Sequence, residues 1–442
     1  MKIAVLCGGL SNERDVSLSG GAGIARALRR LGHRVALLDL FLGYTDTYTD
    51  PEDVFTSTDS GDQMMVAENA PDLDAVRALR PGQGLVGPRV LELCKAADIT
   101  FLALHGEEGE NGKLQAFFDI NGVRYTGSGY LGSALAMNKS LSKALLRDAG
   151  VPVAESITIN RGDKTDISLP FPCVVKPCSG GSSVGTTIVR SAEEYDAALQ
   201  LAFRYEDSVL AESFISGREL TVGVLDGKAM PVTEIIPLSG FYDYKNKYQP
   251  GMTDEPCPAP ITAEQTAAIQ ALAEKVYKTL HLQAYGRVDF IMGTDGVFYC
   301  LEANTLPGMT PTSLIPRMGA AMGLDYGQLC QKLIDASMKN ISYEKLNAKY
   351  YTSSYRRRGQ QTSAGYGAYR HHNRQSGRGA GRAFRRHSRR PGGRPRLHSP
   401  GGGEGSGLRA VQPVRGRTRA PDQGQGRACG PAVYRGVLPR PV

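Results

Sequence analysis

The chain has 442 residues and a formal net charge of +8, but its charges are unevenly distributed. Residues 353–442 contain twenty Arg, no Lys and two acidic residues, so this segment carries about +18 and leaves about −10 for the rest. The length predicts two or three packed domains. The absence of any apolar run near ~18 residues excludes a membrane-spanning class.

The eight Cys are scattered without CxxC spacing, which indicates reduced, mostly structural thiols rather than a disulfide framework or a zinc site. The first residues lead straight into an apolar strand without the pattern of a signal peptide. We therefore expect a cytoplasmic protein with no membrane partner.

The first 128 residues predict a doubly wound α/β domain. An apolar strand over residues 2–6 ends in a pair of glycines, and a helix that ends at Gly32 leads to a second strand over residues 34–40. This succession is typical of an α/β layer whose ligands bind where strands give way to loops. Residues 41–86 are polar and predict a long loop or a small insertion.

A third strand, over residues 99–104, delivers the sequence HGEEGENG at its carboxyl end, followed by a helix over residues 113–121. Because open α/β sheets bind ligands at this end, His105 is a candidate ligand residue, as is Glu13 in the first loop. The alternatives are a capping role for His105 and a solvated loop position for Glu13.

A Gly/Ser-rich loop follows the strand predicted over residues 171–176. Backbone N–H groups and hydroxyls of such a loop can bind phosphates, although no GK[ST] follows, so it is not a P-loop. Lys176 ends the strand, and Lys139 and Lys143 lie in a helix predicted over residues 133–149. Two ammonium groups beside the loop would neutralise phosphates; a flexible connector is the alternative.

The next strand, over residues 209–215, ends beside Phe214 and Ile215. A strand edge with free main-chain groups at this point would suit an adenine, and Glu219 could accept hydrogen bonds from ribose hydroxyls. Phe214 would serve equally well as a core residue.

A β-hairpin is predicted around Asp295-Gly296, because Asp-Gly between alternating runs is a strong hairpin signal. A two-residue loop would place Asp289 opposite Glu302 and Arg287 opposite Asn304. The pattern then predicts an apolar face and a polar face. The apolar face would hold Val288, Phe290, Met292, Tyr299, Leu301 and Ala303.

Two carboxylates that face each other across a strand pair repel and destabilise it. A cation between Asp289 and Glu302 would remove the repulsion, and with Asn304 these oxygen donors suit Mg²⁺ that carries substrate phosphates. The alternative is an ordinary solvated polar face, and a different loop length would break the pairing.

Seven stretches occur in a fixed order along the first 340 residues: GGLSNERDVS, LHGEEGENGKLQ, YTGSG, VVKPCSGGSSVG, FYDYKNKY, GRVDF and LEANTLPGMTPTSL. Together they resemble the D-alanine–D-alanine ligase family of the ATP-grasp superfamily. The resemblance implies an α/β (α+β) ATP-grasp fold in three parts, with domains at residues 1–128, 129–216 and 217–345, the last with a mobile ω-loop and the metal site.

The resemblance also implies the activity. A family member is an ADP-forming enzyme that phosphorylates one D-alanine and lets the amine of a second attack the acyl phosphate, giving D-alanyl-D-alanine for peptidoglycan precursors. It would use ATP with Mg²⁺ or Mn²⁺, as two ions, and act in the cytoplasm as a homodimer through its first domain.

Matching motifs assign roles to individual residues. The phosphates would be bound by Lys139, Lys176 and Lys247, the adenine by Glu212, Phe214 and Ile215, the ribose by Glu219, and the metal by Asp289, Glu302 and Asn304. The first D-alanine would be held by Glu13 and His105, and the site would be closed over it by Ser182 and Tyr248 together with Glu13. The oxyanion would be stabilised by Arg287 and the Gly308 N–H. The second D-alanine would be bound by Ser313 and Leu314.

The same comparison favours D-alanine over other second substrates. Relatives that use D-lactate tend to lack the Lys247-Tyr248 ending, and those that use D-serine usually carry Arg at the position of Leu314. D-Alanine–D-serine or D-alanine–D-lactate ligation remains an alternative. Another is a non-catalytic ATP-grasp module whose basic tail binds nucleic acid.

Residues 346–442 form a tail rich in Arg, Gly and Pro without hydrophobic periodicity, so we expect it to be disordered. Clustered Arg can bind phosphate backbones, but we regard a nucleic-acid partner as the weaker hypothesis. A product of frameshift or readthrough in a GC-rich gene fits the sudden loss of Lys better, and a natural disordered extension is the third alternative. Cys178 and Ser179 depart from the family pattern and could add a reactive thiol.

Overall fold

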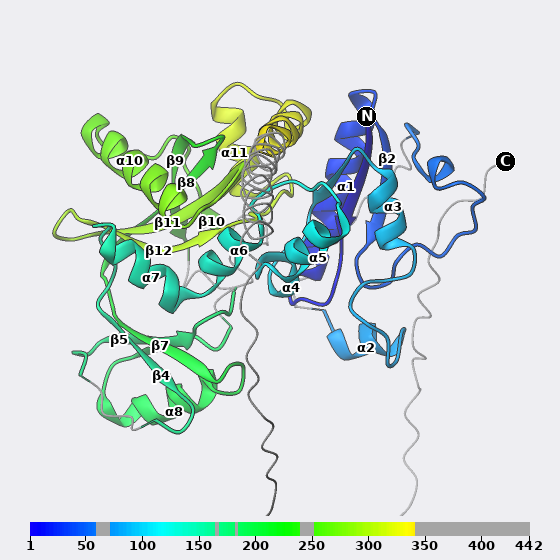
Figure 1. Ribbon diagram of the computed structural model, residues 1–442. Coiled ribbons are helices and arrows are strands. Elements are labelled where there is room, and N and C mark those ends of the chain that lie inside the picture. Colours follow the sequence, from blue (N-terminus) through cyan, green and yellow to red (C-terminus); the bar gives the residue numbers. More distant parts are fainter. Residues whose placement is uncertain (59–70, 164–167, 182–183, 239–251, 341–442) are drawn as a thin grey trace, which may run out of the picture. The chain divides into compact units, whose positions relative to one another are not determined.

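The computed structural model describes residues 1–58, 71–163, 168–181, 184–238 and 252–340 (Figure 1). Three predicted site residues, Ser182, Lys247 and Tyr248, lie outside this part of the chain, as do the rest of the predicted ω-loop and the Arg-rich tail.

The first sheet is parallel, with strand order β2-β1-β3, and confirms the predicted α/β layer. Strands β1 and β3 are almost wholly buried, as expected for a sheet covered by helices, whereas the edge strand β2 is half-buried. The sheet comprises β1 (Lys2–Cys7), β2 (Arg34–Asp39) and β3 (Ile99–Leu102). The helices of this region are α1 (Arg14–Arg30), α2 (Leu73–Ala78), α3 (Val90–Ala96), α4 (Glu107–Glu110) and α5 (Lys113–Asn121).

Within the predicted insertion at residues 41–86, the described positions contain only α2 and a 3₁₀ helix, η1 (Pro51–Val54). The helix predicted over residues 133–149 is two helices, α6 (Tyr130–Met137) and α7 (Lys139–Asp148). Asn138 separates them, because its backbone is extended and its side chain accepts a hydrogen bond from the Leu141 N–H as the N-cap of α7.

An antiparallel sheet with order β4-β7-β5-β6 follows. It comprises β4 (Ser156–Asn160), β5 (Cys173–Pro177), β6 (Thr187–Val189) and β7 (Ser208–Ser213), with α8 (Ala192–Ala202) packed on it. The glycine-rich loop connects β5 to β6, so it joins two strands.

The third sheet is antiparallel, with order β10-β9-β8-β11-β12. It comprises β8 (Gly217–Leu225), β9 (Lys228–Pro237), β10 (Thr253–Asp254), β11 (Tyr285–Gly293) and β12 (Phe298–Asn304). Helix α10 (Ala263–Thr279) packs its buried side chains against this sheet, and α11 (Leu314–Ala321) follows β12. Residues 326–340 form a further helix, which confirms the one predicted over 326–338.

The β11–β12 hairpin has the predicted register at its site end but not at its turn. Asp289 pairs with Glu302 and Arg287 with Asn304, whereas Phe290 pairs with Cys300 across a bulge. The predicted two-residue loop is wrong: the Gly293 N–H donates to the Val297 carbonyl, so three residues form the turn. The turn is one residue longer than predicted, which shifts the strand pairing by one residue. The one-residue bulge shifts the pairing back, so Asp289 still pairs with Glu302.

The bulge also changes the faces of β12. Cys300 takes the buried position next to Phe290, while Leu301 and Tyr299 leave the apolar face on which they were predicted. Leu301 instead lines a cavity together with Ile291. The side chains beyond the bulge, Glu302 and Asn304, keep the polar orientation that the sequence predicted.

Among the residues that the structure describes, no helix combines the length and apolar character required to cross a bilayer.

Candidate active site

Two adjoining cavities contain every predicted site residue that the structure describes. Both are lined by Lys139, Gly180, Gly181, Arg287 and Glu302. The first, here called the substrate cavity, also holds Glu13, His105, Asn304, Gly308, Ser313 and Leu314. The second, here called the nucleotide cavity, also holds Lys176, Glu212, Phe214, Ile215, Glu219 and Asp289.

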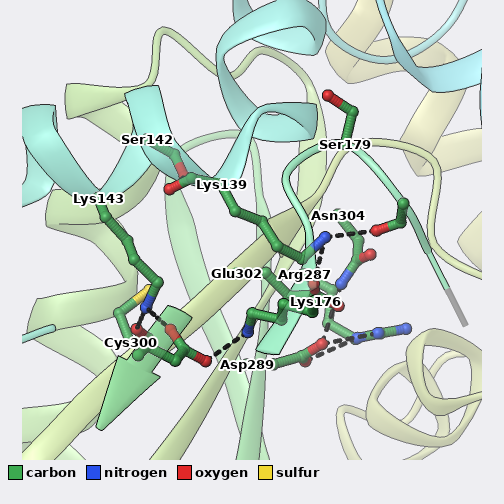
Figure 2. Close-up of polar contacts among 12 residues, drawn as sticks. Lys139, Ser142, Lys143, Lys176, Ser179, Arg287, Asp289, Cys300, Glu302 and Asn304 are labelled. Atoms are coloured by element: carbon green, nitrogen blue, oxygen red, sulfur yellow. Dashed lines mark hydrogen bonds and ion pairs between the residues drawn. The ribbon is translucent and has the colours of Figure 1, made fainter. Parts of the chain in front are cut away.

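Arg287 and Asp289 form the junction of the two cavities. Nε and Nη2 of Arg287 donate to the two carboxylate oxygens of Asp289 at 2.9 and 2.8 Å (Figure 2). Asn304 Nδ2 donates to the same carboxylate at 2.9 Å and Thr221 Oγ1 at 2.6 Å. The buried carboxylate is thus surrounded by donors, as a buried charge requires.

Lys139 brings a second cation to this junction. It is the first residue of α7, and its Nζ lies 3.2 Å from Glu302 Oε2 and 2.5 Å from the Gly180 carbonyl oxygen of the glycine-rich loop. Figure 2 shows Lys139, Lys176 and Arg287 converging from three different elements. An anionic ligand at this point would meet three cations.

The donor set fits a hard divalent cation. Asp289, Glu302 and Asn304 offer only oxygen ligands, and the register puts the two carboxylates directly opposite each other. In the described part of the chain no group of three or more His, Cys, Asp and Glu side chains forms a metal cage. The residues therefore fit Mg²⁺ or Mn²⁺ that shares its coordination with phosphate oxygens.

Glu212 carries a strongly perturbed carboxylate in the nucleotide cavity. Its oxygens lie 2.5 Å from Lys176 Nζ and 2.8 Å from Lys143 Nζ. Burial raises the pKa of Glu212, but the ammonium groups of Lys176 and Lys143 outweigh that effect, so its pKa falls from 4.5 to about 2.

A pH-dependent contribution to stability follows. Because the folded-state pKa of Glu212 is lowered, its stabilisation is complete above the unfolded pKa of 4.5 and is lost as the pH falls toward about 2. We expect the difference in unfolding free energy between wild type and Glu212→Gln to shrink between about pH 7 and about pH 3.5 in urea titrations. A difference that stays constant over this range would contradict the coupling.

The predicted strand edge for an adenine is wrong in one respect. Strand β7 lies between β4 and β5, so it is not an edge strand, and the Phe214 N–H donates to the Pro172 carbonyl at 3.2 Å. Phe214 and Ile215 lie just beyond the end of β7, where they line the nucleotide cavity. Phe214 is 38% exposed, so it is not a core residue.

At the other end, His105 is buried and its Nδ1 lies 2.8 Å from the Leu306 carbonyl oxygen. Its Nε2 is buried and has no hydrogen-bond partner in the part of the chain described here. The carboxylate of Glu13 approaches Gly106, the residue that follows His105. A Cβ placed on Gly106 would lie 3.4 Å from Glu13 Oε2. A ligand with an ammonium group and a carboxylate would find partners here.

The loop after β12 brings Gly308 and Ser313 together. Ser313 Oγ accepts a hydrogen bond from the Thr310 N–H at 3.0 Å, and a Cβ on Gly308 would stand 2.8 Å from this oxygen. A side chain at position 308 would therefore force the Ser313 hydroxyl to move. Ser313 precedes α11 and Leu314 begins it, so both lie at a helix N-terminus, which favours a carboxylate.

Comparison with known proteins agrees with this geometry. The family models described as D-ala D-ala ligase N-terminus and C-terminus match residues 2–128 and 145–335. A D-alanine–D-alanine ligase from Lacticaseibacillus casei is 44% identical over 344 residues, 77% of this chain and 96% of the relative. One from Pediococcus pentosaceus is 41% identical over 345 residues, 77% of this chain and 98% of the relative. The chain belongs to the D-alanine–D-alanine ligase family.

Solved structures of the family also match. The ligase from Bacillus anthracis complexed with ATP superposes with a TM-score of 0.61 at 28% identity, over 78% of this chain and 99% of that one. A second structure of the B. anthracis ligase gives a TM-score of 0.60 at 30% identity over the same shares. The ATP-grasp fold that the sequence predicted is therefore confirmed.

The sequence interpretation missed two acidic residues of the substrate cavity. Glu110 accepts hydrogen bonds from the Gly106 and Leu306 N–H groups at 2.7 and 3.0 Å, and burial raises its pKa, although His105 beside it acts in the opposite direction. Glu255 lines the same cavity and lies 3.0 Å from Arg317 of α11. The HGEEGENG stretch contains three glutamates, and the sequence does not show which of them faces the cavity. The turn of α4 places Glu110 there.

The departure from the family pattern at Cys178 does not produce a reactive thiol. Cys178 is fully buried, and burial with the nearby Glu206 raises its pKa to about 11 against the opposing effect of Lys139 and Lys176. Ser179 instead anchors the glycine-rich loop: its N–H and Oγ donate to the two carboxylate oxygens of Glu206 at 2.6 and 2.9 Å.

Proposed function

We propose that this ligase-family chain joins two D-alanines at the expense of ATP, for the synthesis of peptidoglycan precursors. The nucleotide and substrate cavities share Lys139, Arg287 and Glu302, and this shared wall is the observation that carries the proposal. A γ-phosphoryl group of ATP in one cavity would face an amino-acid carboxylate in the other. Phosphoryl transfer depends chiefly on such positioning and charge neutralisation.

In the first step, the carboxylate of one D-alanine attacks the γ-phosphorus of ATP, which gives an acyl phosphate and ADP. Lys139 and Lys176 neutralise the nucleotide phosphates, and Glu13 with His105 holds the first amino acid by its ammonium end. Asp289, Glu302 and Asn304 would hold Mg²⁺ or Mn²⁺, as two ions, and the metal would neutralise phosphate charge.

In the second step, the amine of another D-alanine, held by Ser313 and the Leu314 N–H, attacks the acyl carbon. Arg287 and the Gly308 N–H stabilise the oxyanion, and phosphate leaves as the peptide bond forms. Ser182, Lys247 and Tyr248 complete the proposal: Lys247 would contact the γ-phosphate, and Tyr248 would exclude water, which an acyl phosphate requires.

We also propose a domain arrangement and an oligomeric state. Residues 1–128 would bind the first substrate, residues 129–216 and 217–345 would hold ATP between them, and two copies would form a homodimer through the first domain in the cytoplasm. A molecular mass in solution near that of one chain would contradict the dimer.

The decisive experiment measures phosphate release from Mg-ATP by the full-length chain with D-alanine as the sole added amino acid. We expect release to depend on D-alanine, with D-serine and D-lactate as weak competitors for the second position. If the full-length chain releases no phosphate, a shortened chain that ends at residue 345 is assayed in the same way. If neither chain releases phosphate in response to D-alanine, the proposed function is wrong. If D-lactate or D-serine is preferred at the second position, that compound replaces D-alanine as the second substrate.

A further inference from the structure

Lys143 is a buried lysine that neither cavity contains. It lies one helical turn after Lys139 on α7, so the two side chains leave the same face of the helix (Figure 2). Its side chain is 1% exposed, and its Nζ lies 2.8 Å from Glu212 Oε2 and 3.5 Å from the Cys300 carbonyl oxygen. Fully buried lysines are rare unless they are paired, because desolvating an ammonium group is costly, and Glu212 is the partner of this one.

Glu212 divides its two oxygens between two lysines of different kinds. Oε1 faces Lys176, which lines the nucleotide cavity and whose side chain is 13% exposed. Oε2 faces Lys143, which has no access to that cavity. One lysine can therefore reach a ligand, and the other cannot.

We infer that Lys143 is a positioning residue for nucleotide binding: it keeps Glu212 neutralised when Lys176 turns from Glu212 to the phosphates of ATP. This inference rests on the proposed function, which makes Lys176 a phosphate ligand. Without Lys143, Glu212 would lose its remaining cation partner at the moment of binding. A buried charge whose partner is removed is strongly destabilised, so Lys176 would stay on Glu212 and the nucleotide would bind weakly.

The ion-paired groups around Glu212, Asp289 and Glu302 carry an excess of positive charge. Lys139, Lys143, Lys176 and Arg287 face three carboxylates, which leaves one net positive charge in this group. Lys143 supplies that excess from a position that no ligand displaces. Its effect on ligands is therefore indirect and acts through Glu212.

The test is the affinity of Lys143→Met for Mg-ADP, measured by calorimetry without amino acid. We expect the dissociation constant to rise at least about tenfold, while kcat at saturating ATP stays within about threefold of wild type. Arg147→Met is the matched control: Arg147 lies one turn further along α7 and is exposed, and its loss removes the same charge. Unchanged ADP affinity in a folded Lys143→Met protein would overturn the inference.

A second measurement separates this role from a purely structural one and remains available if Lys143→Met does not fold. In a Glu212→Gln background there is no carboxylate to neutralise, so adding Lys143→Met should change the ADP dissociation constant by less than about twofold. A rise of about tenfold or more in the dissociation constant of the double variant, relative to Glu212→Gln alone, would overturn the inference. If the inference about Lys143 is wrong, the wild-type chain still binds ADP. If the proposed function is wrong, the wild-type chain does not release phosphate in response to D-alanine.

Discussion

Replacing Glu302 with Gln will lower D-alanine-dependent phosphate release at least about 10³-fold, the scale expected when a group that stabilises transition-state charge is lost. Glu302 lines both cavities, lies 3.2 Å from Lys139 and pairs with Asp289 across the hairpin. The substitution keeps the size of the side chain and removes its charge. Steady-state phosphate release with saturating Mg-ATP and D-alanine measures the effect.

Tyr299→Phe provides the matched control on the same strand. Tyr299 donates to Asp295 at the turn end of the hairpin, away from both cavities, so we expect a rate close to wild type. If Glu302→Gln keeps its rate within about tenfold of wild type, the assignment of Glu302 as a ligand of the metal fails.

Arg287 produces the second large effect, and two substitutions separate its roles. Arg287→Lys keeps a positive charge beside Asp289 but loses the paired Nε and Nη2 contacts, so kcat should fall about 10²–10³-fold. Arg287→Met also leaves the Asp289 carboxylate, 9% exposed, without its cation. That variant should lose about 3–5 kcal/mol of unfolding free energy in addition to its rate.

Urea unfolding together with single-turnover kinetics distinguishes the two roles of Arg287. The proposed oxyanion contact predicts a slow chemical step in both variants and a loss of stability confined to the Met variant. A Lys variant with wild-type single-turnover rate would remove Arg287 from the oxyanion site, whatever its effect on stability.

The sequence was most informative where spacing is set by the backbone. The Asp289–Glu302 pairing was counted from a two-residue loop, which is wrong, and it holds because the longer turn and the bulge cancel. Period-two alternation placed Glu302 and Asn304 on the polar face, and strand–loop–helix order placed His105 at the carboxyl end of β3. These inferences need only local geometry, because alternation and connection order follow from the chain itself. The family motifs supplied the other predicted residues of both cavities, but not Glu110 and Glu255.

Features that depend on tertiary neighbours could not be predicted in this way. Lys143 and Lys139 have the same residue type and lie on the same helix, and only the packing of α7 against β7 and β12 makes one a cavity residue and the other a buried partner of Glu212. The central position of β7 in its sheet likewise follows from long-range pairing. Nothing in the local sequence marks either feature.

The bulge in β12 divides the hairpin into two segments whose lengths vary independently. Between the bulge and the cavities, pairing is fixed by Asp289–Glu302 and Arg287–Asn304; between the bulge and the turn, pairing follows the loop. A one-residue deletion in the Thr294–Gly296 turn can be absorbed by closing the bulge, without moving a carboxylate. The end of this hairpin that carries Asp289 and Glu302 is thereby insulated from insertions and deletions at its tip.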